Sequence, residues 1–143
     1  MIVIGIGSNS RATFADIAAA ICAMEASLGY GEPDAGLCPI ASMRRGDAWT
    51  PLIGRIEAAL DQACRSERNP NRLRWYSQAE LMERNLDCAS LSVATLKAYG
   101  VASVAEAAAL VGAGPGSRLV IPRVVYNNVT AAAARVATLE SKE

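Results

Sequence analysis

The stretch that decides the fold is Ile2-Val3-Ile4-Gly5-Ile6-Gly7, which is followed by the polar loop Ser8-Asn9-Ser10-Arg11. A short run of apolar, mostly β-branched residues that ends in glycine predicts a buried strand of the parallel type. Thr13, with Asp16 in the first turn, then predicts a helix that runs to about Leu28. A strand, a polar loop and a helix in this order are the opening unit of an α/β fold.

The rest of the chain continues this alternation. We expect strands near 37–42, 73–76 and 119–121, and helices at 49–65, after the capping sequence 77–80, near 93–99 and at 104–111. Pro122 follows the last of these strands, and proline prefers a strand end or an edge because it lacks an N–H donor. Residues 130–136 are ambiguous, since their alanines favour a helix whereas a closing strand would complete the sheet.

The expected architecture is therefore an α/β fold, a three-layer α/β/α single domain over residues 1–139. Its sheet is expected to be mixed, mostly parallel and of about five strands. The last residues, 140–143, are expected to form a frayed tail.

Composition narrows the possible functions. The 143 residues are 52% hydrophobic and carry no net charge, so nothing indicates broad attraction to nucleic acid or to membranes. The absence of histidine excludes Ser-His-Asp and Cys-His catalysis and histidine-ligated metals. The four cysteines form no C-x-x-C pair, and we interpret them as buried apolar residues in a reducing cytoplasm. We expect no metal, no cofactor, no membrane span and no signal peptide.

Three polar segments leave the carboxyl ends of the first three expected strands. They are residues 7–11, 42–45 and 77–80. Ligands of open α/β sheets bind beyond these ends, so we expect the three segments to form one site. Their arginines supply planar guanidinium groups that bind carboxylates or phosphates. The candidate binding residues are Gly5, Gly7, Ser8, Asn9, Ser10, Arg11, Ser42, Arg44, Arg45 and Ser77.

Other interpretations of these residues remain open. The run from Gly5 to Ser10 partly resembles a dinucleotide fingerprint, but Ser10 replaces the third glycine and no acid ends the second strand. Ser8, Glu80 and Glu106 are weak catalytic candidates. Ser8 lacks a neighbouring base, and each glutamate stands three residues after a serine, which is the spacing of a capping box.

Motifs in a fixed order run along the chain. They are Val3–Gly7 with Ala12–Ile17, Trp75–Leu81, Gly100–Leu110, Leu119–Arg123 and Val129–Ala132. From end to end they resemble the CobE/CbiG C-terminal-domain family of cobalamin biosynthesis, whose matching segments read FFSAEEL, GV.SVAEAAAL and LLVPR. The resemblance implies a strand at 130–136. Where the family often reads GIGCRRG, this chain has Ser8 for the cysteine and keeps one basic residue, Arg11, which implies binding rather than thiol chemistry.

The resemblance also implies a ligand. It would be a corrinoid or late precorrin, a flat apolar macrocycle rimmed by carboxylates that arginines and helix N-termini can hold. The preferred hypothesis is a non-catalytic protein that binds or carries a late precorrin or hydrogenobyrinic acid-type intermediate of the aerobic pathway, with other cobalamin-pathway enzymes as possible partners. The alternatives are a hydrolase that acts on a precorrin lactone, by analogy with CbiG, and a nucleotide-binding module.

Overall fold

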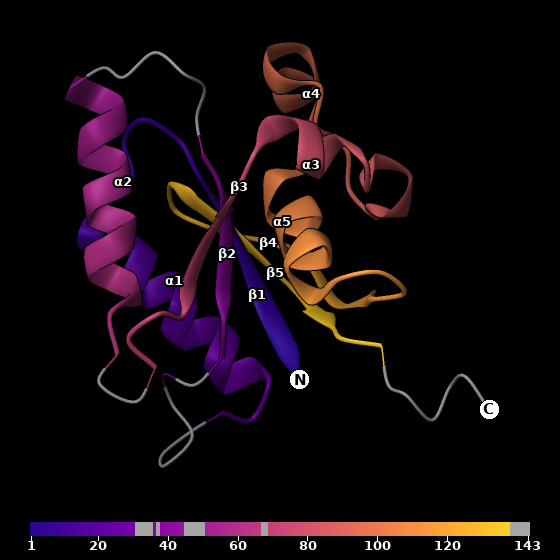
Figure 1. The fold of residues 1–143 in the computed structure, drawn as a ribbon. Helices are drawn as coiled ribbons and strands as arrows, with labels where there is room; N and C mark the ends of the chain where they lie inside the picture. The colour runs from indigo at the N-terminus through magenta and orange to yellow at the C-terminus, as the bar shows by residue number, and fades with distance from the viewer. Residues whose placement is uncertain (31–35, 37, 45–50, 67–68, 138–143) are drawn as a thin grey trace.

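The computed structural model describes residues 1–30, 36, 38–44, 51–66 and 69–137 (Figure 1). The strands are β1 (Ile2–Ser8), β2 (Ile40–Met43), β3 (Leu73–Tyr76), β4 (Arg118–Tyr126) and β5 (Val129–Arg135). The helices are α1 (Phe14–Ser27), α2 (Pro51–Cys64), α3 (Gln78–Met82), α4 (Val93–Tyr99) and α5 (Val104–Ala113), with a 3₁₀ turn at Asn85–Asp87. Two predictions, the role of Arg45 and the tail at 140–143, lie outside the described residues.

The five strands form one mixed sheet in the order β3-β2-β1-β5-β4. β1 pairs in parallel with β2, and β2 with β3, whereas β5 pairs antiparallel with both β1 and β4. The mixed sheet was predicted, although its antiparallel half is larger than expected because β4 and β5 form a hairpin. β5 confirms the strand at 130–136 that the family resemblance implied.

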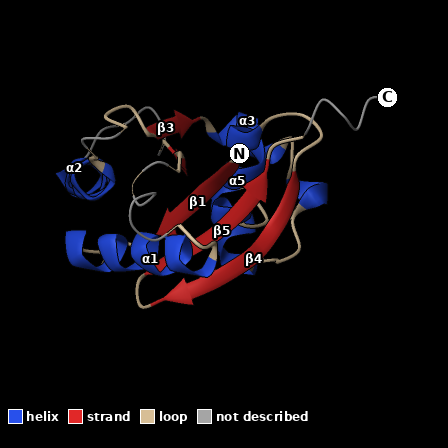
Figure 2. Ribbon diagram, turned by 90° about the horizontal axis from the view of Figure 1, so that it is seen from below, coloured by secondary structure: helices blue, strands red, loops and turns tan. Residues whose placement is uncertain are grey.

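Helices cover both faces of the sheet, which confirms the three-layer architecture (Figures 1 and 2). α1 and α2 lie on one face, where Ile17 and Ile56 pack against side chains such as Ile4 of β1. α3 and α5 lie on the other face, where Leu110 belongs to the same buried cluster as Val3. Successive side chains of a strand point to opposite faces, so the apolar run of β1 contributes side chains to the cores on both faces of the sheet.

Gly5 lies where the backbones of β1 and α5 approach each other closely. A Cβ atom at this position would overlap the carbonyl oxygen of Ala105 and lie 2.6 Å from the backbone nitrogen of Ala109. The absence of a side chain therefore allows the alanine-rich helix α5 to pack directly on the central strand. Gly5 was predicted as a binding residue, and the structure gives it a packing role.

Two smaller predictions need correction. β4 was expected to end at Ile121, but it continues through Pro122 to Tyr126. Pro122 is tolerated because β4 is an edge strand whose register with β5 shifts on both sides of Ile121. Cys22 is exposed, unlike the buried Cys38 and the buried Cys64, because it faces outward on α1.

No single helix among the described residues has the length and apolar character needed to cross a membrane, although α4 and α5 together, with a 65° bend between them, pass that test by length and composition.

Candidate functional site

A pocket of about 260 Å³ opens at the edge of the sheet where the parallel strands end. Loops and helices from both layers contribute to its wall. The lining residues are Gly7, Ser8, Asn9, Ser42, Met43, Ile56, Glu57, Leu60, Trp75, Ser92, Thr95, Tyr99, Ser103, Val104, Arg123, Val125, Asn127, Asn128, Val129 and Thr130. This position agrees with the rule that ligands of open α/β sheets bind beyond the carboxyl ends of the strands.

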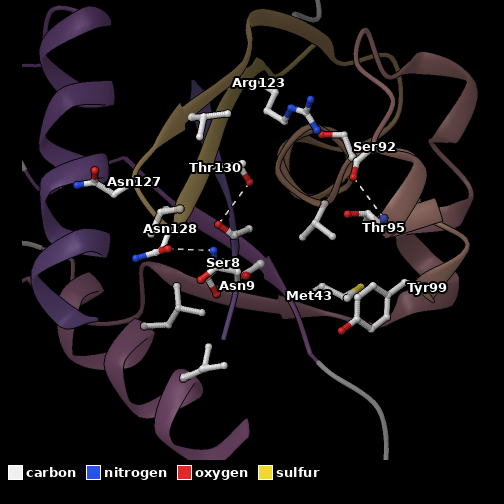
Figure 3. A pocket seen from close by; sticks show the side chains of 18 of the residues that line it. Ser8, Asn9, Met43, Ser92, Thr95, Tyr99, Arg123, Asn127, Asn128 and Thr130 are labelled. Carbon is white, nitrogen blue, oxygen red and sulfur yellow. Dashed lines mark hydrogen bonds between the residues drawn. The ribbon is translucent and has the colours of Figure 1, made fainter. Parts of the chain in front are cut away.

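The polar groups of the wall are mostly neutral hydroxyls and amides. Among the described lining residues, Arg123 is the one cation and Glu57 the one carboxylate. Figure 3 shows Arg123 beside Ser92 on one side of the pocket and Asn128 on the other, with Thr130 between them. Hydroxyls and amides both donate and accept hydrogen bonds, so this wall offers many donors to an anionic or polar group while carrying little net charge.

The hairpin between β4 and β5 and the loop that follows β1 together form the side of the pocket that holds Asn128. The side chain of Asn9 donates to Asn128 Oδ1 at 3.1 Å, and the backbone N–H of Asn9 donates to the carbonyl of Asn128 at 3.0 Å. Asn128 Nδ2 in turn donates to Asp16 Oδ2 at 3.3 Å. The hairpin, the loop and the first turn of α1 are therefore held together as one unit.

Asp16 also closes the N-terminus of α1. The hydroxyl of Thr13 accepts the Asp16 backbone N–H at 3.2 Å, and the Asp16 carboxylate accepts the Thr13 N–H at 3.2 Å, so the predicted cap is a full capping box. The hydrogen bond from Asn128, followed by that from Thr13, lowers the pKa of Asp16 below its ordinary value. A carboxylate of this chain already occupies the helix end that the sequence suggested for an anionic ligand.

Only some of the predicted binding residues reach the pocket. Gly7, Ser8, Asn9 and Ser42 line it, and the Ser42 hydroxyl is itself used in a 2.7 Å bond to the carbonyl of Ile6. The other predicted residues that the structure describes do not line it: Gly5 is buried, and Ser10, Arg11, Arg44 and Ser77 are exposed.

Arg44 remains close to the pocket because it contacts two of the lining residues. Its Nη1 lies 3.3 Å from a carboxylate oxygen of Glu57, and its guanidinium carbon lies 4.8 Å from the ring centre of Trp75. Arg11, by contrast, uses its backbone N–H in a 2.8 Å bond to Asn9 Oδ1 while its side chain is exposed. The cation expected from Arg11 is therefore supplied at the pocket by Arg123.

The two candidate glutamates have structural hydrogen bonds. Glu80 is exposed and completes a capping box with Ser77, whose backbone N–H it accepts at 2.9 Å. Glu106 is fully buried. The predicted capping box at Ser103 is only half formed, because the Ser103 hydroxyl accepts the Glu106 N–H at 3.4 Å while the Glu106 carboxylate binds Ser90 and Arg123 instead.

Sequence reasoning missed Arg123 and the α4 residues Ser92 and Thr95. Arg123 follows Pro122 in a segment that was interpreted as a strand end and as one of the family motifs. Pro122, which interrupts the strand, is the local signal of an irregular backbone there. Ser92 caps α4 by accepting the Thr95 N–H at 3.3 Å, so its sequence pattern is that of an ordinary helix start. Their proximity to β1 follows from tertiary packing.

The sheet order, the two helical layers and the strand-end pocket define a three-layer α/β/α domain with a polar pocket at the edge of the sheet where the parallel strands end. The family model described as cobalamin synthesis G C-terminus matches residues 2–134. The chain belongs to this family and so to cobalamin biosynthesis, as the sequence motifs indicated.

Two solved structures are similar to the chain. CobE, a protein from the cobalamin biosynthetic pathway, superimposes with a TM-score of 0.70 at 24% identity, over 96% of this chain and 92% of CobE. The cobalamin biosynthesis protein ChiG from Agrobacterium tumefaciens has a TM-score of 0.65 and 30% identity, over 96% of this chain and 100% of that one. The likeness to CobE supports the fold. The search of curated protein sequences found no match to the chain.

Proposed function

We propose that the chain binds a corrinoid of the late precorrin or hydrogenobyrinic acid type and carries it between enzymes of the aerobic cobalamin pathway in the cytoplasm. The observation that supports this proposal is the strand-end pocket, in which Arg123 stands among neutral hydroxyls and amides. A corrinoid offers apolar ring faces and an edge of acetate and propionate carboxylates. A guanidinium binds a carboxylate through two parallel N–H donors, and nearby hydroxyls supply further donors.

The volume of the pocket limits how much of such a ligand enters. The cavity holds about 260 Å³, whereas pockets that enclose drug-sized ligands hold roughly 300–1,000 Å³. A tetrapyrrole-derived ring with its side chains exceeds a drug-sized ligand, so we expect one carboxylate-bearing edge to enter. Trp75 and Tyr99 line the pocket and offer aromatic surface to the ring. Partial enclosure suits a carrier because the exposed part of the ligand stays accessible to the next enzyme.

The geometry supports binding more than hydrolysis. Glu80 and Glu106, the two carboxylates considered for acid–base work, are held in a capping box and in a buried set of hydrogen bonds. Glu57, the carboxylate among the described lining residues, pairs with Arg44. General acid–base catalysis requires a proton-transferring group within reach of the substrate, and these carboxylates are already committed to other partners.

The proposal is tested by titrating the purified chain with hydrogenobyrinic acid and recording its visible spectrum. We expect a spectral shift that saturates at micromolar protein. Arg123→Ala removes a charge-assisted hydrogen bond worth about 1.5–3 kcal/mol, so Kd should rise by roughly 10- to 150-fold. Arg11→Ala is the matched control, because it removes an exposed arginine outside the pocket and should change Kd less than about twofold.

Three results would contradict the proposal. They are the absence of a spectral shift with wild-type protein, saturable binding of NAD or ATP at similar concentrations, and turnover of the corrinoid by the purified chain. A larger loss of affinity in Arg11→Ala than in Arg123→Ala would instead move the carboxylate contact back to the loop that follows β1.

A further inference from the structure

Glu106 connects the first turn of α5 to two segments that are distant in the sequence. Its side chain is 0% exposed, and none of the ion pairs among the described residues involves it. Oε1 accepts the Ser90 N–H at 2.8 Å, while Oε2 accepts the Ser90 hydroxyl at 3.0 Å and the Arg123 N–H at 2.9 Å. A buried carboxylate that is satisfied by neutral donors fixes the positions of those donors closely.

The bond to Arg123 falls at an irregular part of β4. Ile121 is paired with Ala133 and Val124 with Ala131, so three steps along β4 correspond to two along β5, and the extra residue forms a bulge. A bulged residue leaves the ladder, and its side chain is aimed in a new direction. In this strand the Arg123 N–H binds Glu106, and the Arg123 side chain lines the pocket.

The bond to Ser90 acts on the opposite part of the same wall. Ser90 stands two residues before Ser92, which caps α4 and lines the pocket together with Thr95. The Ser92 N–H also donates to the carbonyl of Ala102 at 2.8 Å, which joins the start of α4 to the segment that enters α5. Glu106 thus holds both the bulge of β4 and the approach to α4, and Figure 3 shows Arg123 and Ser92 close together.

We infer that Glu106 is a positioning residue for ligand binding, which acts by holding the bulge of β4 so that the Arg123 guanidinium lies in the pocket. This inference rests on the proposed function, since it concerns the same site. Glu106 itself does not line the pocket. Its effect on affinity therefore passes through Arg123, and this dependence separates positioning from a general contribution to stability.

Glu106→Gln is the informative change because it keeps the shape of the side chain. An amide has one acceptor oxygen and one NH₂ donor, whereas both carboxylate oxygens of Glu106 accept backbone N–H groups. Whichever way the amide turns, either the Ser90 or the Arg123 N–H faces another donor. The bulge of β4 or the approach to α4 must then shift, and we expect Kd for hydrogenobyrinic acid to rise about tenfold.

The test is a double-mutant cycle on the full chain, with Kd measured by spectral titration for wild type, Glu106→Gln, Arg123→Ala and the double variant. If Glu106 acts through Arg123, Glu106→Gln should change Kd less than about twofold once Arg123 is alanine. Glu25→Gln is the control, because Glu25 is also buried but belongs to the opposite face, where it pairs with Arg72 at 3.6 Å. It should lower Tm without changing Kd.

A second measurement needs no ligand and no variant at position 106. The amide hydrogens of Ser90 and Arg123 should exchange slowly in the wild-type chain, and Ser90→Ala, which removes the 3.0 Å hydroxyl bond, should speed exchange at Arg123. Equal losses of affinity from Glu106→Gln with and without Arg123, or fast exchange of the Arg123 amide in wild type, would overturn the inference. Absence of corrinoid binding by wild type would refute the proposed function instead, while leaving the exchange result intact.

Discussion

Gly5→Ala gives the most direct test of how the domain is assembled. The new methyl group would overlap the carbonyl oxygen of Ala105 and lie 2.6 Å from the nitrogen of Ala109. Both are backbone atoms of α5, and β1 is the central strand of the sheet, so no flexible side chain can move aside. Overpacking of a core costs typically about 1–3 kcal/mol, and we expect the upper end here because two backbones must separate.

The magnitude can be measured by urea unfolding followed by circular dichroism. A loss of about 3 kcal/mol is a large fraction of the roughly 5–15 kcal/mol that stabilises a typical domain. For a chain of 143 residues, it should lower Tm by roughly 10 °C. The m-value should stay unchanged, which would show that the native state is destabilised without a change in the surface exposed on unfolding.

Gly29→Ala is the matched control for this measurement. Gly29 has φ +82°, and a Cβ atom added there would have no neighbouring atom within 4 Å, so alanine meets backbone strain but no overlap. Left-handed backbone costs an alanine about 1–2 kcal/mol. Gly5→Ala must therefore destabilise more than Gly29→Ala. If it costs less than about 1 kcal/mol, or less than the control, the close approach of β1 and α5 is refuted.

Two further predictions concern titratable side chains. Burial raises the pKa of Cys38 to about 11, of Cys64 to about 12 and of Cys88 to about 11. A reagent that reacts with thiolates should therefore label the exposed Cys22 fast at neutral pH and the other three cysteines slowly. A fast phase of labelling that survives Cys22→Ser would contradict this prediction. Hydrogen bonds lower the pKa of Asp16 in the folded state. The stability that the ionised Asp16 contributes to the fold is therefore present above the unfolded pKa of 3.8, and it is lost as the pH falls through the lower folded pKa. The Tm difference between wild type and Asp16→Asn should shrink below pH 4, and a difference that stays constant into acid would refute that coupling.

The features that sequence reasoning predicted correctly depend on neighbours in the chain. The Thr13 and Ser77 caps need only a hydroxyl and a carboxylate three residues apart, and both capping boxes are formed. Ser103 has the same local pattern, yet the Glu106 carboxylate turns away from it toward Ser90 and Arg123, 16 and 17 residues away in the sequence. A local pattern predicts which side chains can form a cap, whereas tertiary packing decides which partner is bound.

The same contrast between local pattern and tertiary packing explains why Arg11 was predicted at the pocket and Arg123 was not. Arg11 comes directly after β1, so proximity in the sequence made it the natural candidate. Arg123 reaches the pocket only because β4 pairs with β5, β5 pairs with β1, and β4 bulges between Ile121 and Val124. None of these pairings can be recognised from the residues next to Arg123 in the sequence, apart from the proline that precedes it.

One topological fact accounts for both the larger antiparallel half of the sheet and the unexpected arginine. β5 runs opposite to β1, and the pairs Gly7–Thr130 and Ser8–Val129 place the start of β5 at the end of β1. The β4–β5 hairpin therefore turns at the same edge where the parallel strands end. A purely parallel sheet would leave that edge to strand-to-helix loops, whereas here the hairpin adds Asn128 and Arg123 to the wall. The pocket thus belongs to the junction between the two halves of the sheet, and under the proposed function this is why Arg123→Ala in β4 should lower ligand affinity more than Arg11→Ala in the loop that follows β1.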